Sequence, residues 1–566
     1  MTDYRKLKSG TDIRGRAIGS DDVPAVLTAD VVKDFARAFA LWLTKRTGKD
    51  NCRIVVGRDS RLTGEAFTDA IITALRPAGL DIIDCGLFST PAAFVVTQLP
   101  SVQADGSVMI TASHHPKDIN GLKFFTADGG VNSNELDEII ELASEGKAIS
   151  STAHSTVVRR ACLRLYSNVL TEEIRKGTGL YLPLKNMKIV VDAGHGAGGF
   201  FAENVLAPLG ADISASQFLT PDGNFPAHAP NPENKQAMDS LKQQVLSVNA
   251  DLGVIFDADV DRCAVVASDG TEINRSALIA LASAIVLPDH PGATIVTDSV
   301  TTEGLRRFIE SKGGVQKRFR RGYRNVIDEA KRLNDIGVDA PLAIETSGHA
   351  AFSEHYFLDD GAYFVCKILI TMSELRRKGM SITDLIADYD PPLEEADIRL
   401  SFTGENWREL AGTVITRLTA LSERLLELSP DNYEGVRAYV SHADGYFIVR
   451  TSVHDPVLPI YIESGKKGGA LSIARFLYSF LNGFNGIDCV PLADFIADGE
   501  AQQKADAADE AAMLDAKKQD DFADVEPIDG SVAVDATDAD VDADIYAAVD
   551  TDVDYGADTD DFTDKP

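Results

Sequence analysis

The chain has 566 residues, of which 44% are hydrophobic and 25% are charged, and its net charge is −32. This length predicts three to five domains of about 100 to 200 residues each, and the acidic balance argues against nucleic acid as a partner. No apolar run reaches the roughly 18 residues that cross a bilayer, and the N-terminal segment lacks the apolar core of a signal peptide. The six cysteines form no Cys-x-x-Cys pair. We therefore expect a cytoplasmic protein with no membrane contact, disulfide framework or zinc cage.

Three stretches of the chain share one pattern: an apolar β-branched run, a polar or glycine-containing loop, an amphipathic helical segment and a second apolar run. They are residues 52–86, 187–218 and 293–319. The pattern predicts three βαβ units in parallel sheets that helices cover on both faces. Downstream of each unit another apolar run ends in a polar loop, with the sequences "TASHHP", "DADVDR" and "ETSGH". Because ligands collect at the carboxyl ends of strands in open α/β sheets, we expect these loops to meet at one cleft.

The C-terminal part of the chain differs from the three repeated units. Residues 390–492 alternate polar and apolar positions and include "GYFIVRTSVHDPVLPIYIES", which predicts two strands around a polar loop in a smaller α+β domain. Residues 500–566 hold 22 acidic and 4 basic residues and few large apolar ones. Such a segment cannot bury enough apolar surface to offset the entropy of ordering, so we expect an acidic disordered tail.

The loop "DADVDR" places three carboxylates, Asp257, Asp259 and Asp261, at alternate positions after an apolar run. If the chain stays extended, they lie on one side and can converge on a cation, and ligation by oxygen alone suits Mg²⁺. A calcium loop is excluded by Arg262 and Ser268, which stand where a glycine and a glutamate are needed. A phosphatase in which the first aspartate is the nucleophile remains open.

The loop "TASHHP" offers Ser113 as a carrier of a phosphoryl group. A phosphoserine carries a charge of about −1.5 to −2 and needs cations around it. His114, Lys123, Arg262 and a metal ion can supply them. The alternative is a serine that only caps a helix or a turn.

The loop "ETSGH" supplies a carboxylate, a hydroxyl and an imidazole at alternate positions. Glu345 and Ser347 can hold two neighbouring sugar hydroxyls, and His349 is a candidate general acid or base. A serine hydrolase is disfavoured because the chain lacks a Gly-x-Ser-x-Gly elbow here.

Two further loops carry cationic residues. The segment "RTSVHDP" provides Arg450, Ser452 and His454 between two predicted strands and is typical of a phosphate-binding loop. Residues 320–325, "RRGYRN", add more basic and small residues. Each segment taken alone is also compatible with an ordinary basic surface loop.

The four motifs, in this order along residues 1 to about 492, resemble those of the α-D-phosphohexomutases, and most closely the phosphomannomutase/phosphoglucomutase branch. The resemblance implies a four-domain α/β architecture, with three similar α/β domains with mixed sheets and a smaller α+β C-terminal domain, followed here by the acidic tail. The expected domains are residues 1–155 (phosphoserine), 156–273 (metal-binding), 274–389 (sugar-binding), 390–492 (phosphate-binding) and 493–566 (tail).

The resemblance also implies a role for each matching residue. The residues around the transferred phosphoryl group would be Ser113 as the phosphoserine with His114, Lys123, Arg14, Arg262 and His349. The ligands of Mg²⁺ would be Ser113, Asp257, Asp259 and Asp261. The residues that bind the substrate would be Glu345, Ser347, Gly322, Tyr323, Arg450, Ser452 and His454.

A protein of this kind interconverts hexose 1-phosphate and hexose 6-phosphate, with mannose or glucose as the sugar, through a phosphoserine and a 1,6-bisphosphate intermediate. The resemblance therefore implies a hexose phosphate substrate, Mg²⁺, activation by hexose 1,6-bisphosphate, and a monomer or weak homodimer. Three alternatives stay open: a phosphoglucosamine mutase, a sugar-phosphate phosphohydrolase that uses the aspartate loop, and a regulatory protein that only binds sugar phosphates.

Overall fold

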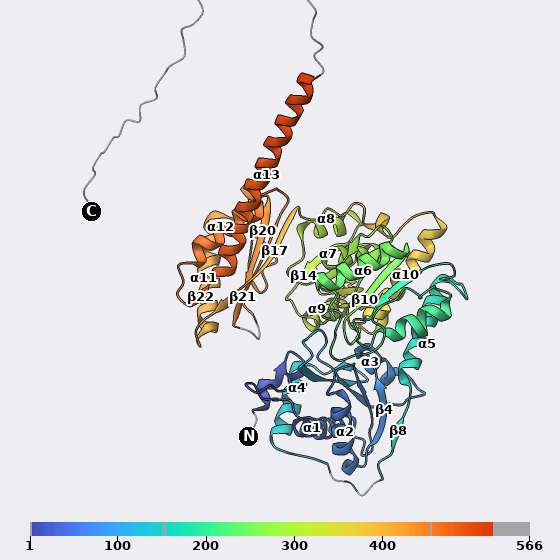
Figure 1. The fold of residues 1–566 in the computed structure, drawn as a ribbon. Helices are drawn as coiled ribbons and strands as arrows, with labels where there is room; N and C mark the ends of the chain where they lie inside the picture. The colour runs from blue at the N-terminus through green and yellow to red at the C-terminus, as the bar shows by residue number, and fades with distance from the viewer. Residues whose placement is uncertain (1–2, 150, 152–153, 453–455, 524–566) are drawn as a thin grey trace, which may run out of the picture. The chain divides into compact units, whose positions relative to one another are not determined.

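The computed structural model describes residues 3–149, 151, 154–452 and 456–523. Within these ranges the chain forms four sheets, three of them mixed α/β sheets and the fourth antiparallel, as Figure 1 shows from blue to orange. The expected order of three α/β domains and a different fourth domain is confirmed. No helix in the described ranges combines the length and the apolar character needed to cross a membrane.

The first domain is built on an eight-stranded sheet with the order β1-β2-β6-β5-β3-β4-β8, in which β7 also pairs with β6. Its central strands are continuous apolar runs, and every residue of β5 is buried because helices cover both faces. The strands are β1 (Lys8–Ser9), β2 (Asp12–Arg16), β3 (Arg53–Arg58), β4 (Asp81–Leu87), β5 (Gly106–Ile110), β6 (Ile119–Thr126), β7 (Gly129–Gly130) and β8 (Val157–Arg159). The helices are α1 (Ala29–Thr47), α2 (Gly64–Leu75), α3 (Thr90–Gln98) and α4 (Ser133–Ser144).

The second and third domains have four-stranded sheets with the orders β12-β11-β10-β9 and β14-β13-β15-β16. The elements of the second are α5 (Cys162–Thr178), β9 (Ile189–Asp192), α6 (Lys235–Val248), β10 (Leu252–Phe256), β11 (Cys263–Ala267) and β12 (Glu272–Ile273). Those of the third are α7 (Arg275–Val286), β13 (Thr294–Thr297), α8 (Glu303–Ser311), β14 (Val315–Arg318), α9 (Tyr323–Asp335), β15 (Leu342–Ile344), β16 (Ala350–Phe352) and α10 (Gly361–Arg377).

The repeat predicted from the sequence corresponds to a repeated strand order. In the first and third domains the order is β4-β3-β5-β6 and β14-β13-β15-β16, with the first three strands parallel and the last antiparallel. The second domain repeats the last three positions as β9-β10-β11. Each of the three polar loops therefore leaves the corresponding strand of its sheet, β5, β10 or β15.

The second repeated unit departs from the prediction at residues 211–218, which were expected to form a strand. This segment meets β9 and its flank only through single bridges, from Lys188 to Asp212 and from Asp192 to Gln217. The side chain of Asp212 accepts the backbone N–H of Ser214 at 3.0 Å, and this local bond competes with a strand ladder.

The fourth domain has an antiparallel sheet with the order β18-β19-β20-β21-β17-β22, and the two strands predicted around "RTSVHDP" are β20 and β21. Its elements are β17 (Glu394–Phe402), α11 (Trp407–Leu425), β18 (Glu427–Leu428), β19 (Gly435–Val440), β20 (Gly445–Arg450), β21 (Val457–Ser464), α12 (Gly469–Leu481), β22 (Ile487–Asp488) and α13 (Val490–Ala523). Helix α13 runs past residue 493, so the first part of the segment expected to be a disordered tail is helical. Residues 524–566 lie outside the described ranges.

The buried apolar residues separate the fourth domain from the others. One continuous core extends through the first three domains and includes α3, α5, α7 and α10. The fourth domain has a core of its own between its sheet and helices α11 and α12. The loops of the first three domains are thus fixed to a shared core, whereas the predicted phosphate loop belongs to a separately packed unit.

Candidate active site

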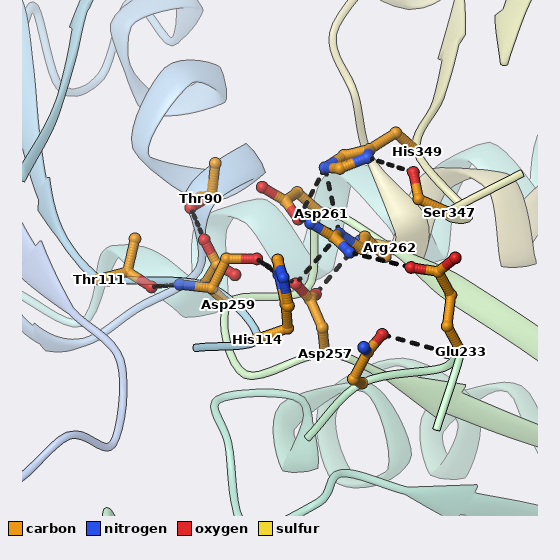
Figure 2. A network of polar contacts seen from close by, with 12 residues as sticks. Thr90, Thr111, His114, Glu233, Asp257, Asp259, Asp261, Arg262, Ser347 and His349 are labelled. Carbon is orange, nitrogen blue, oxygen red and sulfur yellow. Dashed lines mark hydrogen bonds and ion pairs between the residues drawn. The ribbon is translucent and has the colours of Figure 1, made fainter. Parts of the chain in front are cut away.

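One polar loop from each of the three α/β domains meets at a single buried cluster, shown in Figure 2. The loops are residues 111–118 after β5, 257–262 after β10 and 345–349 after β15. The hydroxyl of Ser113 donates to Asp257 Oδ2 at 2.8 Å, which joins the first loop to the second. Arg262 Nε donates to His349 Nε2 at 3.2 Å, which joins the second to the third. The convergence expected from the strand ends is therefore present in the structure.

Ser113 is held in a strained and buried position. Its φ of 51° lies in the left-handed region that few residues other than glycine adopt, and only 1% of the residue is exposed. Its backbone N–H donates to Thr111 Oγ1 at 2.9 Å, and its hydroxyl lies 3.3 Å from His114 Nδ1. Backbone strain of this kind concentrates at functional sites. The hydroxyl is thus fixed between a carboxylate and an imidazole.

The three aspartates converge through a turn and not through the extended segment that the sequence analysis expected. Asp257, Asp259 and Asp261 are fully buried and have ligand atoms within 4.8 Å of one another. In an extended strand the Cα atoms of Asp257 and Asp261, four residues apart, would lie about 13 Å from each other, which is too far for all three carboxylates to reach one ion. The turn, in which Val260 adopts a φ of 70°, brings them together.

The aspartate cluster fits a hard divalent cation. Oδ1 of Asp259 and Oδ1 of Asp261 are buried and have no hydrogen-bond partner among the described residues, an arrangement that is costly without a ligand. Burial and the neighbouring charges of Asp261 and Asp259 raise the pKa of Asp257 well above its usual value. A cation such as Mg²⁺, which takes oxygen ligands, would satisfy these atoms and relieve the repulsion.

Two cationic side chains border the cluster from the first domain. Lys123, which is 3% exposed, pairs with Asp261 and lies 3.5 Å from Asp259 Oδ2. Burial alone would lower the pKa of Lys123, but these carboxylates outweigh it and hold the pKa well above its usual value. Arg14 pairs with Asp12 at 2.8 Å, and its buried Nε has no partner within the described part of the chain. Both groups can therefore neutralise an anionic ligand.

The two adjacent histidines, His114 and His115, lie close to the positive charges of Arg262 and Arg14. The charge of Arg262, followed by burial, holds the pKa of His114 well below its usual value, which disfavours a positive charge on this ring. Burial and the charge of Arg14 lower the pKa of His115 to about 4. The two rings stack with centroids 4.9 Å apart. A doubly charged phosphoryl group on Ser113 would oppose the shift at His114.

The imidazole of His349 is oriented by bonds to both of its nitrogens. Arg262 Nε can only donate, so Nε2 of His349 is the acceptor and carries no proton in this contact. Nδ1 lies 2.9 Å from the hydroxyl of Ser347 and 3.5 Å from Glu345 Oε2. Figure 2 shows Nε2 pointing toward Asp261, at 3.5 Å from Oδ1. His349 thus presents a proton-accepting nitrogen to the cluster.

The segment "RRGYRN" lies beside the "ETSGH" loop. Its residues 320–322 form a loop, named here the sugar loop, and Tyr323 begins helix α9. The N–H of Gly322 donates to Glu345 Oε1 at 2.6 Å, and the ring of Tyr323 stacks on His349 with centroids 5.2 Å apart. Gly348 has a φ of 93°, and a Cβ there would lie 2.6 Å from the carbonyl oxygen of Cys263, so only glycine fits.

The predicted phosphate loop is only partly described. Arg450 ends β20, and its Nε lies 4.0 Å from Glu434 Oε1. Ser452 follows in the loop, and the predicted contact of His454 falls on residues 453–455, which lie outside the described residues. Within the described residues, Arg450 forms an ion pair with Glu434.

Further residues, not predicted from the sequence, hold the reactive loop. Arg61, which has a fully buried side chain, donates to the carbonyl oxygens of Pro116 and Ile119 at 2.7 Å, and also to those of Ser113 and His115. Its Nε donates to Asp59 at 3.1 Å.

Two threonines were missed as well. Thr111 Oγ1 donates to Asp59 at 2.7 Å, and Thr90 donates its hydroxyl to Asp259 Oδ2. The motif "GRDSR" at the end of β3 was the available signal for Arg61 and Asp59, because it is another polar cluster at the carboxyl end of a strand.

The fold and the site together define a protein of the phosphohexomutase type, and comparison with known proteins agrees. Models of the phosphoglucomutase/phosphomannomutase alpha/beta/alpha domains I, II and III match residues 5–149, 165–270 and 274–391. A phosphomannomutase/phosphoglucomutase of Pseudomonas putida is 30% identical over 432 residues, which are 75% of this chain and 87% of the relative. A phosphoglucomutase of Neisseria gonorrhoeae is 28% identical over 81% of this chain and 93% of its own.

A solved structure of a phosphoglucomutase/phosphomannomutase family protein from Burkholderia thailandensis aligns with a TM-score of 0.70 and 26% identity. The alignment covers 85% of this chain and 99% of that one. The chain therefore belongs to the phosphoglucomutase/phosphomannomutase family.

Proposed function

We propose that this enzyme interconverts hexose 1-phosphate and hexose 6-phosphate, with mannose and glucose as the sugars, through a phosphorylated Ser113 and a 1,6-bisphosphate intermediate. The observation that carries this proposal is the placement of Ser113: a strained, buried serine whose hydroxyl meets a cluster of three aspartates and is bordered by Lys123 and Arg262. A serine that only caps a turn needs none of these groups. Relatives named phosphomannomutase/phosphoglucomutase support the choice of sugars.

Mg²⁺ is the proposed metal, held by Asp257, Asp259 and Asp261 together with an oxygen on Ser113. When bound, the ion would neutralise charge on the phosphoryl oxygens. The residues of the chain do the rest of the work. Lys123 and Arg14 balance the remaining negative charge, and positioning of the two reactants supplies much of the rate.

In the forward half-reaction a sugar hydroxyl attacks the phosphorus, the bond from phosphorus to Ser113 Oγ breaks, and this oxygen leaves as an alkoxide whose charge a bound cation would balance. In this structure the lone pair of His349 Nε2 accepts the N–H of Arg262, and it takes the hydroxyl proton once the substrate displaces that contact. After the bisphosphate turns end for end, the Ser113 oxygen attacks the other phosphorus, and the sugar oxygen that leaves takes the proton back from His349.

The remaining residues bind the substrate in this proposal. Glu345 and Ser347 hold sugar hydroxyls beside the loop of Gly322 and Tyr323, and Arg450, Ser452 and His454 hold the phosphate that does not react. Activation by hexose 1,6-bisphosphate follows, because this compound can phosphorylate Ser113. Location in the cytoplasm and a monomeric or weakly dimeric state stay predictions.

A coupled mutase assay tests the proposal. Glucose 1-phosphate and mannose 1-phosphate are supplied in parallel with Mg²⁺ and a trace of hexose 1,6-bisphosphate, and free phosphate is measured alongside. Formation of the 6-phosphates, with one phosphoryl group on Ser113 by mass spectrometry, is the expected result. Release of free phosphate as the sole product would instead identify a phosphohydrolase.

Replacing Thr90 with valine is expected to weaken Mg²⁺ binding by about 10- to 100-fold, because Thr90 orients the Asp259 carboxylate and outer-sphere partners of metal ligands contribute on this scale. Calorimetric titration with Mg²⁺ measures the effect without relying on activity. Thr97→Val is the matched control, since Thr97 lies on the same helix and its hydroxyl donates to the Phe94 carbonyl oxygen. Equal affinity of T90V and T97V for Mg²⁺ would contradict the prediction.

A further inference from the structure

A carboxylate stands beside the proposed phosphate anchor in the fourth domain. Glu434 immediately precedes β19, and Gly435 pairs with Arg450 across the sheet, so the register places Glu434 next to the guanidinium of Arg450. The two side chains are 16% and 14% exposed, and Oε1 lies 4.0 Å from Nε. At this distance a partly buried carboxylate and guanidinium attract each other. The cation proposed to bind phosphate is thus already facing an anion.

The same carboxylate reaches across to the third domain. Its Oε1 accepts the hydroxyl of Ser299, and its Oε2 accepts the backbone N–H of Arg321 at 3.0 Å. Arg321 belongs to the sugar loop, residues 320–322, in which the N–H of Gly322 donates to Glu345. Glu434 therefore joins the phosphate anchor of one domain to the sugar loop of another.

The two domains remain in contact without Glu434. Arg437, which is 1% exposed, donates to the carbonyl oxygens of Ser299 and Thr301 and pairs with Glu303 at 3.1 Å. A small apolar cluster of Val300, Ile448 and Tyr461 adds to the same interface. The contacts of Arg437 and of this apolar cluster hold the interface in addition to those of Glu434.

We propose that Glu434 is a positioning residue that occupies the place of a phosphate at Arg450 and is displaced when the non-reacting phosphate of the substrate binds. This proposal rests on the proposed role of Arg450. A phosphate monoester carries close to two negative charges at neutral pH, so it outcompetes a single carboxylate for the guanidinium and repels it. Departure of Glu434 releases Ser299 Oγ and the N–H of Arg321. Arrival of a phosphate at the fourth domain is thereby transmitted to the sugar loop.

Phosphate binding at Arg450 and release of the Arg321 N–H are coupled in this proposal. This coupling suits a reaction in which one intermediate must leave and rebind in the opposite orientation. While phosphate is bound, the hydrogen bond from the Arg321 N–H to Glu434 is broken. When phosphate leaves, the Glu434 carboxylate accepts this hydrogen bond again and neutralises the charge of Arg450. Binding energy for phosphate is reduced by the cost of displacing Glu434, which keeps the bisphosphate from being held too tightly to turn.

The test compares Glu434→Gln with wild type. Removing the competing charge is expected to tighten inhibition by inorganic phosphate and to lower KM for hexose 6-phosphate by about three- to tenfold, and the difference should shrink in high salt. Glu427→Gln, an exposed neutralisation on β18 of the same sheet, is the control and should change neither value. Phosphate inhibition that is unchanged or weaker in E434Q would overturn the proposal.

Two further arms separate this proposal from the role of Arg450. In wild type, saturating phosphate should speed hydrogen exchange at the Arg321 amide, because its acceptor leaves; exchange that is equally slow with and without phosphate would overturn the displacement. Arg450→Ala should weaken phosphate inhibition more than tenfold. If it does not, the anchor is misassigned and this proposal fails with it, whereas failure of E434Q alone leaves the mutase function and the anchor intact.

Discussion

Replacing Ser113 with alanine is expected to reduce mutase turnover by about 10⁴-fold or more, because the proposed chemistry passes through a covalent bond to its oxygen and no other group can take that place. Stability should change little. Alanine has the same Cβ as serine in the left-handed region, so the strain at a φ of 51° is unaltered. The variant loses the hydrogen bond to Asp257, which a bound cation would offset.

The measurement is the coupled assay on glucose 1-phosphate and mannose 1-phosphate, together with thermal unfolding of the same samples. Ser107→Ala is the matched control, since this buried serine of β5 donates to the Ala93 carbonyl oxygen and lies outside the loop. It should lose about 1 kcal/mol of stability and keep its activity. Full activity in S113A would refute the phosphoserine mechanism and turn attention to Asp257 as a nucleophile.

The repeated α/β architecture could be predicted because it depends on local pattern. Buried parallel strands need continuous apolar runs, and the runs at β3, β9 and β13 are unmistakable. The prediction failed at residues 211–218, where the Asp212 side chain accepts the backbone N–H of Ser214 and pairing with β9 and its flank is limited to single bridges. It also missed the helical continuation of α13 past residue 493, because composition identifies weak burial but does not exclude helix formation.

The candidate site was predictable in its contents and less so in its geometry. Loops at corresponding strand ends had to meet, so the proximity of Ser113, Asp257 and His349 followed from topology. The turn at Val260 could not be foreseen, since a β-branched residue with positive φ has no local signal. The lowered pKa of His114 could not be predicted from the sequence either, because it depends on the charge of Arg262, which lies far away in the sequence.

Replacing Arg61 with alanine is expected to lower the free energy of unfolding by about 3 to 5 kcal/mol, since it leaves the buried carboxylate of Asp59 without its ion pair. The same change removes the donors to the carbonyl oxygens of the loop around Ser113, so turnover should fall by about 100-fold even where the protein is folded. Urea unfolding and the mutase assay measure the two effects separately.

The pH dependence of the stability loss identifies its cause. Burial raises the pKa of Asp59 to about 6 even with Arg61 present, and without that guanidinium the pKa must rise further. A carboxyl whose pKa is higher in the folded state than in the unfolded state becomes more destabilising as pH rises from its unfolded value toward its folded one. The stability of R61A relative to wild type should therefore fall further at pH 8 than at pH 5.

Two further variants test whether the losses in R61A come from the particular contacts of Arg61 or from the removal of any positive charge in this region. Arg58→Ala removes a guanidinium at the end of the same strand that pairs with the exposed Glu65, and it should cost under about 1 kcal/mol. Arg61→Lys restores the charge beside Asp59 but cannot span the carbonyl oxygens that the guanidinium fork reaches, so it should recover stability more than turnover. A lysine variant with full turnover would mean that Arg61 serves only to neutralise Asp59 and that the loop around Ser113 holds its conformation unaided.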